Sequence, residues 1–142
     1  MAKLPIGIRQ NNAGNIRVSS SQWEGKMISD GAYERFETAE DGLRALMKLL
    51  YIYQKRYGLK TITDIISRWA PSFENKTRAY IEDVSQRTNI SPDSDIDLSQ
   101  KETLIKLAKA IVIHESGHPI DGWPENWYRD ETYEAAAERA LA

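Results

Sequence analysis

Apolar residues recur at helical spacing in several segments of the chain and predict a mainly helical protein. The clearest pattern begins after Thr38 and ends before Gly58. Its apolar positions lie three or four residues apart and therefore share one helix face: Leu43, Leu46, Met47 and Leu50. Thr38 can cap the first turn, with Asp41 three positions later, and Gly58 is a typical helix stop. We expect one long helix between Thr38 and Gly58.

Four further segments carry similar patterns and predict four more helices. They lie within residues 59–70, 71–89, 100–116 and 130–142. Thr61 or Thr63 is expected to cap the first of them, and Ser99 with Glu102 forms an S-x-x-E capping box at the third. Residues 5–31 are instead rich in Gly, Asn and Ser, and they predict loops with at most one short hairpin.

The composition is that of a soluble globular protein that forms one domain, residues 1–142. Hydrophobic residues make up 41% of the chain and charged residues 28%, which is ordinary for this class. The formal net charge of −2 indicates no general attraction to nucleic acid. The chain has no cysteine, which excludes disulfides, thiolate catalysis and cysteine-bound zinc. It has neither the apolar core of a signal peptide nor an apolar run of about 20 residues, so we expect synthesis in the cytoplasm and no membrane span.

The segment Ala110–Trp123, AIVIHESGHPIDGW, contains the pattern H-E-x-x-H of zinc proteases. Such a site needs both histidines on one helix face, one turn apart. Gly117 is a typical helix stop, and Pro119 disfavours a helical conformation at the preceding His118. We therefore expect the helix to end before the second histidine, and we predict no metal site and no cofactor. His114 and His118 are then incidental residues near a helix end.

Glu115 is the more informative residue of this segment. At 100° per residue it continues the apolar stripe of its own helix, which includes Leu104, Leu107, Ala108 and Ile111. Burial and the negative end of the helix dipole both favour the protonated form of a carboxyl group. A general acid needs that form in order to protonate a glycosidic oxygen. The alternative is a glutamate in the final turn that points into solvent.

Several motifs resemble those of soluble lytic transglycosylases and goose-type lysozymes. LAKAIVIHESGHP, residues 107–119, resembles their apolar helix that ends in Glu-Ser-Gly. Thr77, Tyr80 and Ile81 match a Thr-x-x-Tyr-hydrophobic pattern, and NNAGNIR, residues 11–17, loosely resembles the turn that lines the family's cleft. The chain is also similar, over nearly its full length, to small lysozyme-like proteins of tailed phages, through GIR-NNxGNIR, RWAP-x-x-EN-x-T-x-x-Y and HE-x-G.

The resemblance implies a lysozyme-like fold and an enzyme that cleaves the β-1,4 bond between N-acetylmuramic acid and N-acetylglucosamine in peptidoglycan. In the transglycosylases the glutamate segment comes first, whereas here it comes near the end, so we infer a circular permutation. Glu115 is the implied general acid/base of a lytic transglycosylase or a muramidase. The implied glycan-binding residues are Tyr80, Ser116, Asn12, Asn15 and Trp23.

These residues also have plainer structural explanations. Tyr80 and Trp23 can be core or rim aromatics, and Asn12 and Asn15 can be turn formers. A muramidase would need a second carboxylate, and the possible sources are Asp30, Glu34, Glu37 and Glu40. These acidic side chains also fit solvated positions or the first turn of a helix, where they complement the dipole. Arginines that can meet peptide-stem carboxylates, or simply be solvated, are Arg9, Arg17 and Arg44.

The resemblance further implies a phage setting. The expected partners are peptidoglycan glycan strands and other virion or tail proteins, with no nucleic acid. The protein would be made in the host cytoplasm and then carried in the virion or tail, or delivered to the periplasm. Two alternatives remain: a non-catalytic virion or tail protein with a lysozyme-like fold, and a small zinc protease.

Overall fold

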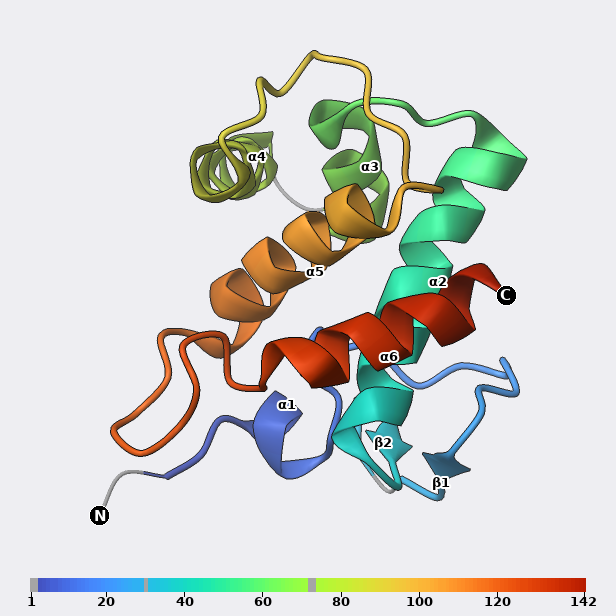
Figure 1. The fold of residues 1–142 in the computed structure, drawn as a ribbon, viewed down its shortest axis with the longest axis vertical. Coiled ribbons are helices and arrows are strands. Elements are labelled where there is room, and N and C mark those ends of the chain that lie inside the picture. Colours follow the sequence, from blue (N-terminus) through green and yellow to red (C-terminus); the bar gives the residue numbers. More distant parts are fainter. Residues whose placement is uncertain (1–2, 30, 72–73) are drawn as a thin grey trace.

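Helix α2, Ala39–Tyr57, runs along the long axis of the molecule and is the helix predicted between Thr38 and Gly58 (Figure 1). The computed structural model describes residues 3–29, 31–71 and 74–142. Thr38 Oγ1 accepts a hydrogen bond of 3.1 Å from the backbone N–H of Asp41. Gly58 ends the helix with a left-handed φ of 66°, which glycine adopts without steric cost. The predicted apolar face is buried: Leu43, Leu46, Met47 and Leu50.

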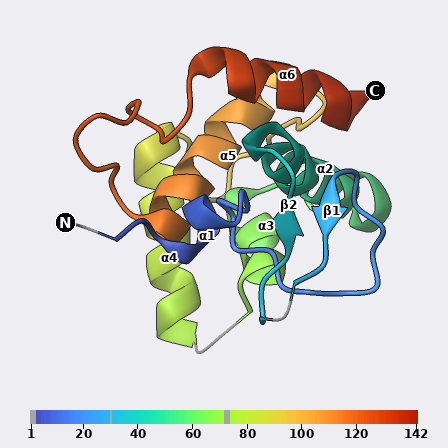
Figure 2. The same cartoon turned by 90° about the horizontal axis from the view of Figure 1, so that it is seen from below.

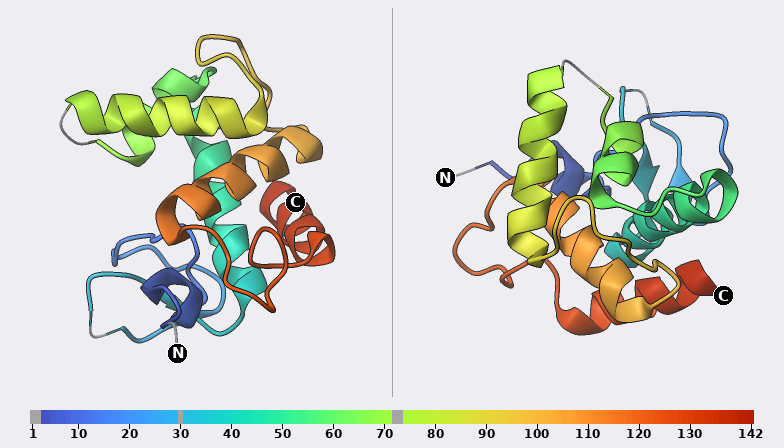
Figure 3. Two further views of the ribbon diagram at one scale, coloured as in Figure 1. Left: turned by 90° about the vertical axis from the view of Figure 1, so that its left-hand side faces the viewer. Right: turned by 90° about the horizontal axis from the view of Figure 1, so that it is seen from above.

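Four more helices follow α2 within the four predicted segments. They are α3 (Ile62–Trp69), α4 (Glu74–Thr88), α5 (Lys101–Ser116) and α6 (Asp130–Leu141). Helix α5 lies in the middle, with α4 on one side and α2 and α6 on the other (Figure 3). Its buried residues include the predicted stripe of Leu104, Leu107, Ala108 and Ile111. The prediction of a mainly helical protein is confirmed, and none of the helices in the described part of the chain is long and apolar enough to cross a membrane.

Capping follows the sequence at α3 but not at α5. Thr61 Oγ1 accepts a hydrogen bond of 3.1 Å from the backbone N–H of Asp64, as one of the two predicted caps. The predicted capping box of Ser99 and Glu102 is wrong. The Ser99 hydroxyl instead donates a hydrogen bond of 2.6 Å to Asp97 Oδ1. Such local side-chain turns compete with helix capping, and here the turn prevails.

The N-terminal segment forms a short helix and a turn beside the C-terminal end of α5, and then a hairpin beside α2 (Figure 2). Helix α1, Ile6–Arg9, was not expected, because four residues are too few to show a hydrophobic period. In the NNAGN turn, Asn11 and Asn15 both adopt a left-handed φ, 56° and 54°, which asparagine tolerates. The expected hairpin pairs β1, Lys26–Met27, antiparallel with β2, Arg35–Phe36, so its second strand lies beyond the segment in which we expected it.

Candidate functional site

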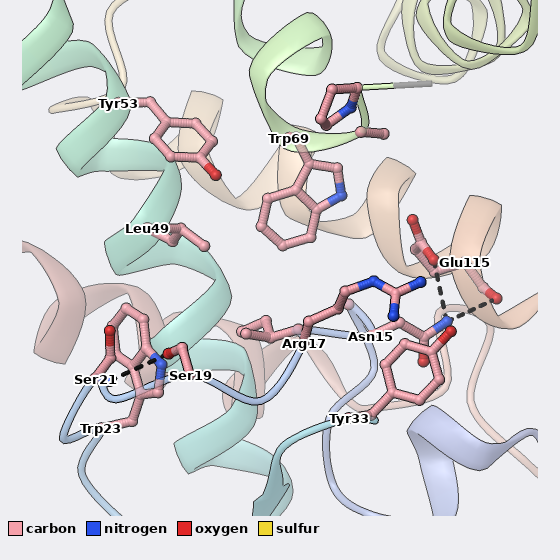
Figure 4. Close-up of a pocket in the computed structure, with 14 residues that line it drawn as sticks. Asn15, Arg17, Ser19, Ser21, Trp23, Tyr33, Leu49, Tyr53, Trp69 and Glu115 are labelled. Carbon is pink, nitrogen blue, oxygen red and sulfur yellow. Dashed lines mark hydrogen bonds between the residues drawn. The ribbon is translucent and has the colours of Figure 1, made fainter. Parts of the chain in front are cut away.

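The carboxylate of Glu115, in the last turn of α5, is hydrogen-bonded through both oxygens. The Tyr80 hydroxyl, on α4, donates to Oε2 at 2.8 Å. Asn15, in the turn after α1, donates from Nδ2 to Oε1 at 3.0 Å (Figure 4). The Glu115 side chain is half-buried rather than enclosed, and it does not swing freely into solvent. Three segments that are far apart in the sequence therefore meet at this carboxylate.

The chain turns sharply away from α5 directly after this site. Helix α5 ends at Ser116, and Gly117 follows with φ 78° and ψ −178°, a conformation that is essentially restricted to glycine. The Trp127 indole Nε1 donates to the Gly117 carbonyl at 2.8 Å and fixes this turn. His118 thus lies outside the helix, as predicted, and the helical H-E-x-x-H geometry does not form. In residues 3–29, 31–71 and 74–142, no three His, Asp or Glu side chains are grouped closely enough to hold a metal ion.

Tyr80 is held in place by aromatic and polar neighbours. The Trp69 indole Nε1 donates to the Tyr80 hydroxyl oxygen at 3.2 Å. The imidazole of His114 stacks on the Tyr80 ring, with centroids 3.6 Å apart and planes inclined by 27°. His114 Nδ1 lies 2.8 Å from Asp83 Oδ2, and the single N–H of Arg87 Nε is shared between the two Asp83 oxygens. His114 lies in the last turn of α5 as expected, and it packs directly behind the tyrosine that contacts Glu115.

The Tyr80 hydroxyl keeps its proton and so remains able to donate its hydrogen bond to Glu115. Burial, and next the negative charge of Glu115, raise the pKa of Tyr80 far above its ordinary value of 10.0. The hydroxyl therefore stays protonated at neutral pH. Tyr80 is also a core residue, 5% exposed, and its hydroxyl contacts Glu115 from within the core.

A cavity of about 510 Å³ opens in front of Glu115 (Figure 4). The NNAGNIR turn contributes Asn15 and Arg17, helix α2 contributes Leu49 and Tyr53, and Trp69 comes from the end of α3. Four more residues lie on its polar and aromatic side: Ser19, Ser21, Trp23 and Tyr33. The structure thus brings Asn15, Trp23 and Glu115 together at one cavity, as the resemblance implied. Nothing in the local sequence pattern indicated Tyr33 or Tyr53.

Glu115 also borders a second cavity, of about 470 Å³. This cavity is lined by Lys76, Thr77, Ala79 and Tyr80 of α4, together with Ala70, His114 and Glu115. Ala70 and Glu115 line both cavities, so the carboxylate stands where the two adjoin.

Ser116 and Asn12 do not line either cavity. The buried Ser116 hydroxyl donates to the Ala13 carbonyl at 3.0 Å and ties the NNAGN turn to the end of α5. Asn12 is 0% exposed, and its side chain bonds to the backbone of Ile16 and Glu34. The prediction that these two residues contact a glycan is corrected here: both shape the turn that carries Asn15.

Of the acidic residues considered as a second carboxylate, the three that the structure describes do not line the cavity. Glu34 is fully buried and pairs with Lys26 at 3.1 Å. Glu40, in the first turn of α2, accepts a hydrogen bond of 2.7 Å from Arg139. Glu37 is exposed and does not line the cavity, and Asp30 lies outside the described residues.

The three arginines have different surroundings. Arg44 pairs with Glu24 at 3.5 Å, and Arg9 Nε donates to the Leu4 carbonyl at 3.1 Å. Only Arg17, among these three, lines the cavity in front of Glu115.

A comparison with known proteins shows that the chain is similar to a phage protein. No family model matches the chain. The chain is 37% identical over 116 residues to Protein P5 of Pseudoalteromonas phage PM2, and the alignment covers 78% of this chain and 71% of that protein. With this identity over most of both proteins, the chain belongs to the family of Protein P5 of phage PM2.

Proposed function

We propose that this phage-family protein binds peptidoglycan glycan strands and cleaves the β-1,4 bond between N-acetylmuramic acid and N-acetylglucosamine. The observation that carries the proposal is the position of the Glu115 carboxylate, which two donors orient at the point where two cavities adjoin. An enzyme that cuts inside a glycan needs an acid at the scissile oxygen and room for a sugar ring on either side of it. The two cavities provide such room.

The cavity walls suit carbohydrate. Trp23, Tyr33 and Trp69 offer flat aromatic faces, and Ser19 and Asn15 offer polar groups beside them. Binding sites of this kind combine apolar and aromatic surfaces with a few placed polar groups. We further propose that the helical architecture is lysozyme-like and circularly permuted, with Glu115 at the position of the family's catalytic glutamate.

In the proposed reaction Glu115 acts first as acid and then as base. Its carboxyl group donates a proton to the glycosidic oxygen as the bond from that oxygen to the anomeric carbon breaks. The resulting carboxylate then takes a proton from the sugar's own C6 hydroxyl, which closes a 1,6-anhydro ring, or from a water molecule, which gives a hydrolysed product. Tyr80 and Asn15 keep the carboxylate oriented between the two steps.

Membership of a phage protein family favours a second candidate function, a non-catalytic component of the virion or tail with the same fold. In that case the Glu115 network would bind a glycan or stabilise the end of α5 without chemistry. Both functions share the glycan-strand or virion partners that the resemblance implies. They differ in whether purified cell wall is degraded.

A zymogram on purified cell wall separates the two candidates. The wild-type protein is compared with Glu115→Gln, and with Glu131→Gln as a control at an exposed position of α6 that lines neither cavity. We expect clearing by the wild type and the control only. Equal clearing by Glu115→Gln would contradict the general-acid role, and no clearing by any of the three would favour the non-catalytic function. Mass spectrometry of the released fragments distinguishes anhydro from hydrolysed ends.

A further inference from the structure

Arg17 is the one cationic side chain among the described residues that line the cavity in front of Glu115. In Figure 4 it extends along the cavity toward Asn15 and Glu115. Within the described part of the chain, the only other charged residue that lines this cavity is Glu115, and its two oxygens already accept hydrogen bonds from Tyr80 and Asn15. Among the described lining residues, the guanidinium of Arg17 is therefore a positive group that forms no ion pair with Glu115.

Tyr33 holds the arginine in this position. Arg17 and Tyr33 face each other across an antiparallel bridge, and the guanidinium carbon lies 5.4 Å from the centre of the tyrosine ring. A guanidinium that lies over a ring keeps its N–H groups at its edge available to acceptors. Across residues 3–29, 31–71 and 74–142, no carboxylate forms an ion pair with Arg17.

Two other arginines of the protein, Arg139 and Arg44, are paired with carboxylates. Arg139 contacts the carboxylates of Glu24, Glu40 and Asp41 at 2.7 to 2.9 Å, and Arg44 pairs with Glu24. Arg17 differs from them because it is oriented by an aromatic ring inside a cavity. A planar guanidinium binds a carboxylate through two parallel hydrogen bonds, which a lysine cannot do.

We propose that Arg17 recognises a carboxylate carried by the bound glycan, so that the cavity selects an acidic amino sugar over a neutral one. The inference rests on the proposed function, because it assumes that the cavity binds a glycan. The carboxylate can belong to the lactyl ether of the sugar or to a peptide attached to it. Both sources present the same group to the guanidinium.

Binding measurements by calorimetry test this selection without any need for turnover. Glu115→Gln protein is titrated with a tetrasaccharide of alternating N-acetylglucosamine and N-acetylmuramic acid, with its methylamide, in which the carboxylates are blocked, and with neutral chitotetraose. A peptide-bearing tetrasaccharide forms a fourth arm. The same ligands are titrated into the double variants that add Arg17→Gln, Arg17→Lys or Arg35→Gln. Arg35 is exposed on β2 and does not line the cavity, so its variant is the matched charge control.

We expect Arg17→Gln to weaken binding of the free-acid tetrasaccharide by about tenfold or more, and binding of the two neutral ligands by much less. Arg17→Lys should recover part of the loss, and Arg35→Gln should change little. A larger effect on the peptide-bearing ligand than on the free acid would assign the contact to the peptide carboxylates. Equal effects of Arg17→Gln on acidic and blocked ligands, or no effect, would overturn the selection while leaving glycan binding intact. Absence of binding for every glycan would instead overturn the proposed function and this inference with it.

Discussion

The Tyr80 hydroxyl lies 2.8 Å from Oε2 of Glu115 and links helix α4 to the last turn of α5. This hydrogen bond lies beside both cavities, because Glu115 lines both of them and Tyr80 lines one. Behind it, Trp69 donates to the same hydroxyl and His114 stacks on the ring. The orientation of the carboxylate therefore depends on how α4 packs against α5 and on how α3 packs against α4.

Replacement of Tyr80 by phenylalanine tests this link. The ring and its stacking on His114 remain, but Glu115 loses a donor and the Trp69 indole loses its acceptor. We expect a fall in kcat of about ten- to hundredfold with a small change in KM, because a misoriented acid slows the chemical step more than binding. The loss of two hydrogen bonds should lower the free energy of unfolding by about 1 to 2 kcal/mol. Cell-wall turnover kinetics and urea denaturation measure both effects.

Tyr57→Phe serves as the control, because Tyr57 is 52% exposed at the end of α2 and lines neither cavity. It should leave kcat unchanged. If Tyr80→Phe retained the full kcat in cell-wall assays, the orienting role of the hydroxyl would be wrong, whatever its effect on stability.

The parts of the fold that could be predicted from the sequence are those set by local signals. The stripe of α5 and its end at Gly117 follow from side-chain periodicity and from the conformational freedom of one glycine. Glu115 is indicated by its place on this stripe and by the resemblance to a known family, whereas Tyr80 is indicated by the resemblance alone. The contact between them required the packing of α4 on α5, which no spacing along the chain reveals.

The places that other residues take at the site depend on such tertiary contacts. His114 matters because Asp83, 31 positions earlier, lies on the facing helix. The antiparallel bridge to Tyr33 and the contact with its ring position Arg17 in the cavity. The failed cap at Ser99 has a local cause, since two hydrogen-bonding patterns compete for one hydroxyl and sequence alone does not rank them.

The Asp83–His114 pair predicts a specific dependence of stability on pH. Burial opposes the ionisation of Asp83, but hydrogen bonds from His114 and Arg87 outweigh it and hold the pKa of Asp83 below its ordinary value of 3.8. The charged form is thus favoured by folding. The contribution of ionised Asp83 to the free energy of unfolding is complete at pH values above the ordinary pKa of 3.8. It is lost as the pH falls through the lowered pKa that Asp83 has in the folded protein.

Asp83→Asn should therefore reduce the free energy of unfolding near neutral pH by up to about 1 kcal/mol, the usual range for a partly exposed pair. The difference from the wild type should shrink as the pH is lowered from about 5 to about 2. Urea denaturation across this range measures it, with the exposed Asp121→Asn as control. If the difference in free energy of unfolding grew as the pH was lowered, the proposed stabilisation by ionised Asp83 would be wrong.

Ser116→Ala tests the anchor between the NNAGN turn and α5. The variant leaves the buried Ala13 carbonyl without the donor that lies 3.0 Å away, so the free energy of unfolding should fall by about 1 to 2 kcal/mol. Because the turn carries Asn15 and Arg17 into the cavity, KM for cell wall should rise as well. Ser99→Ala is the matched control, since its hydroxyl is exposed and caps no helix. A larger stability loss at Ser99 than at Ser116 would contradict both assignments.

Gly7→Ala tests how closely α1 must approach the turn. A Cβ atom at Gly7 would lie 2.6 Å from both the Asn12 carbonyl oxygen and Asn15 Oδ1, far inside van der Waals contact. Alanine favours a helix by about 0.5 to 1 kcal/mol over glycine, but overpacking of this kind costs about 1 to 3 kcal/mol. We therefore expect net destabilisation in urea denaturation.

The same clash predicts an effect on the site. The Asn15 side chain can yield more easily than the Asn12 backbone, and its displacement would break the hydrogen bond to Glu115. Cell-wall turnover should therefore fall by more than the loss of folded protein explains, and an NMR shift of the Asn15 side-chain amide would report the displacement directly. Gly31→Ala, where a Cβ atom meets nothing within 4 Å, should leave stability within about 0.5 kcal/mol and turnover unchanged. If Gly7→Ala behaved like Gly31→Ala in all three measurements, the close approach of α1 would not be what positions Asn15 against Glu115.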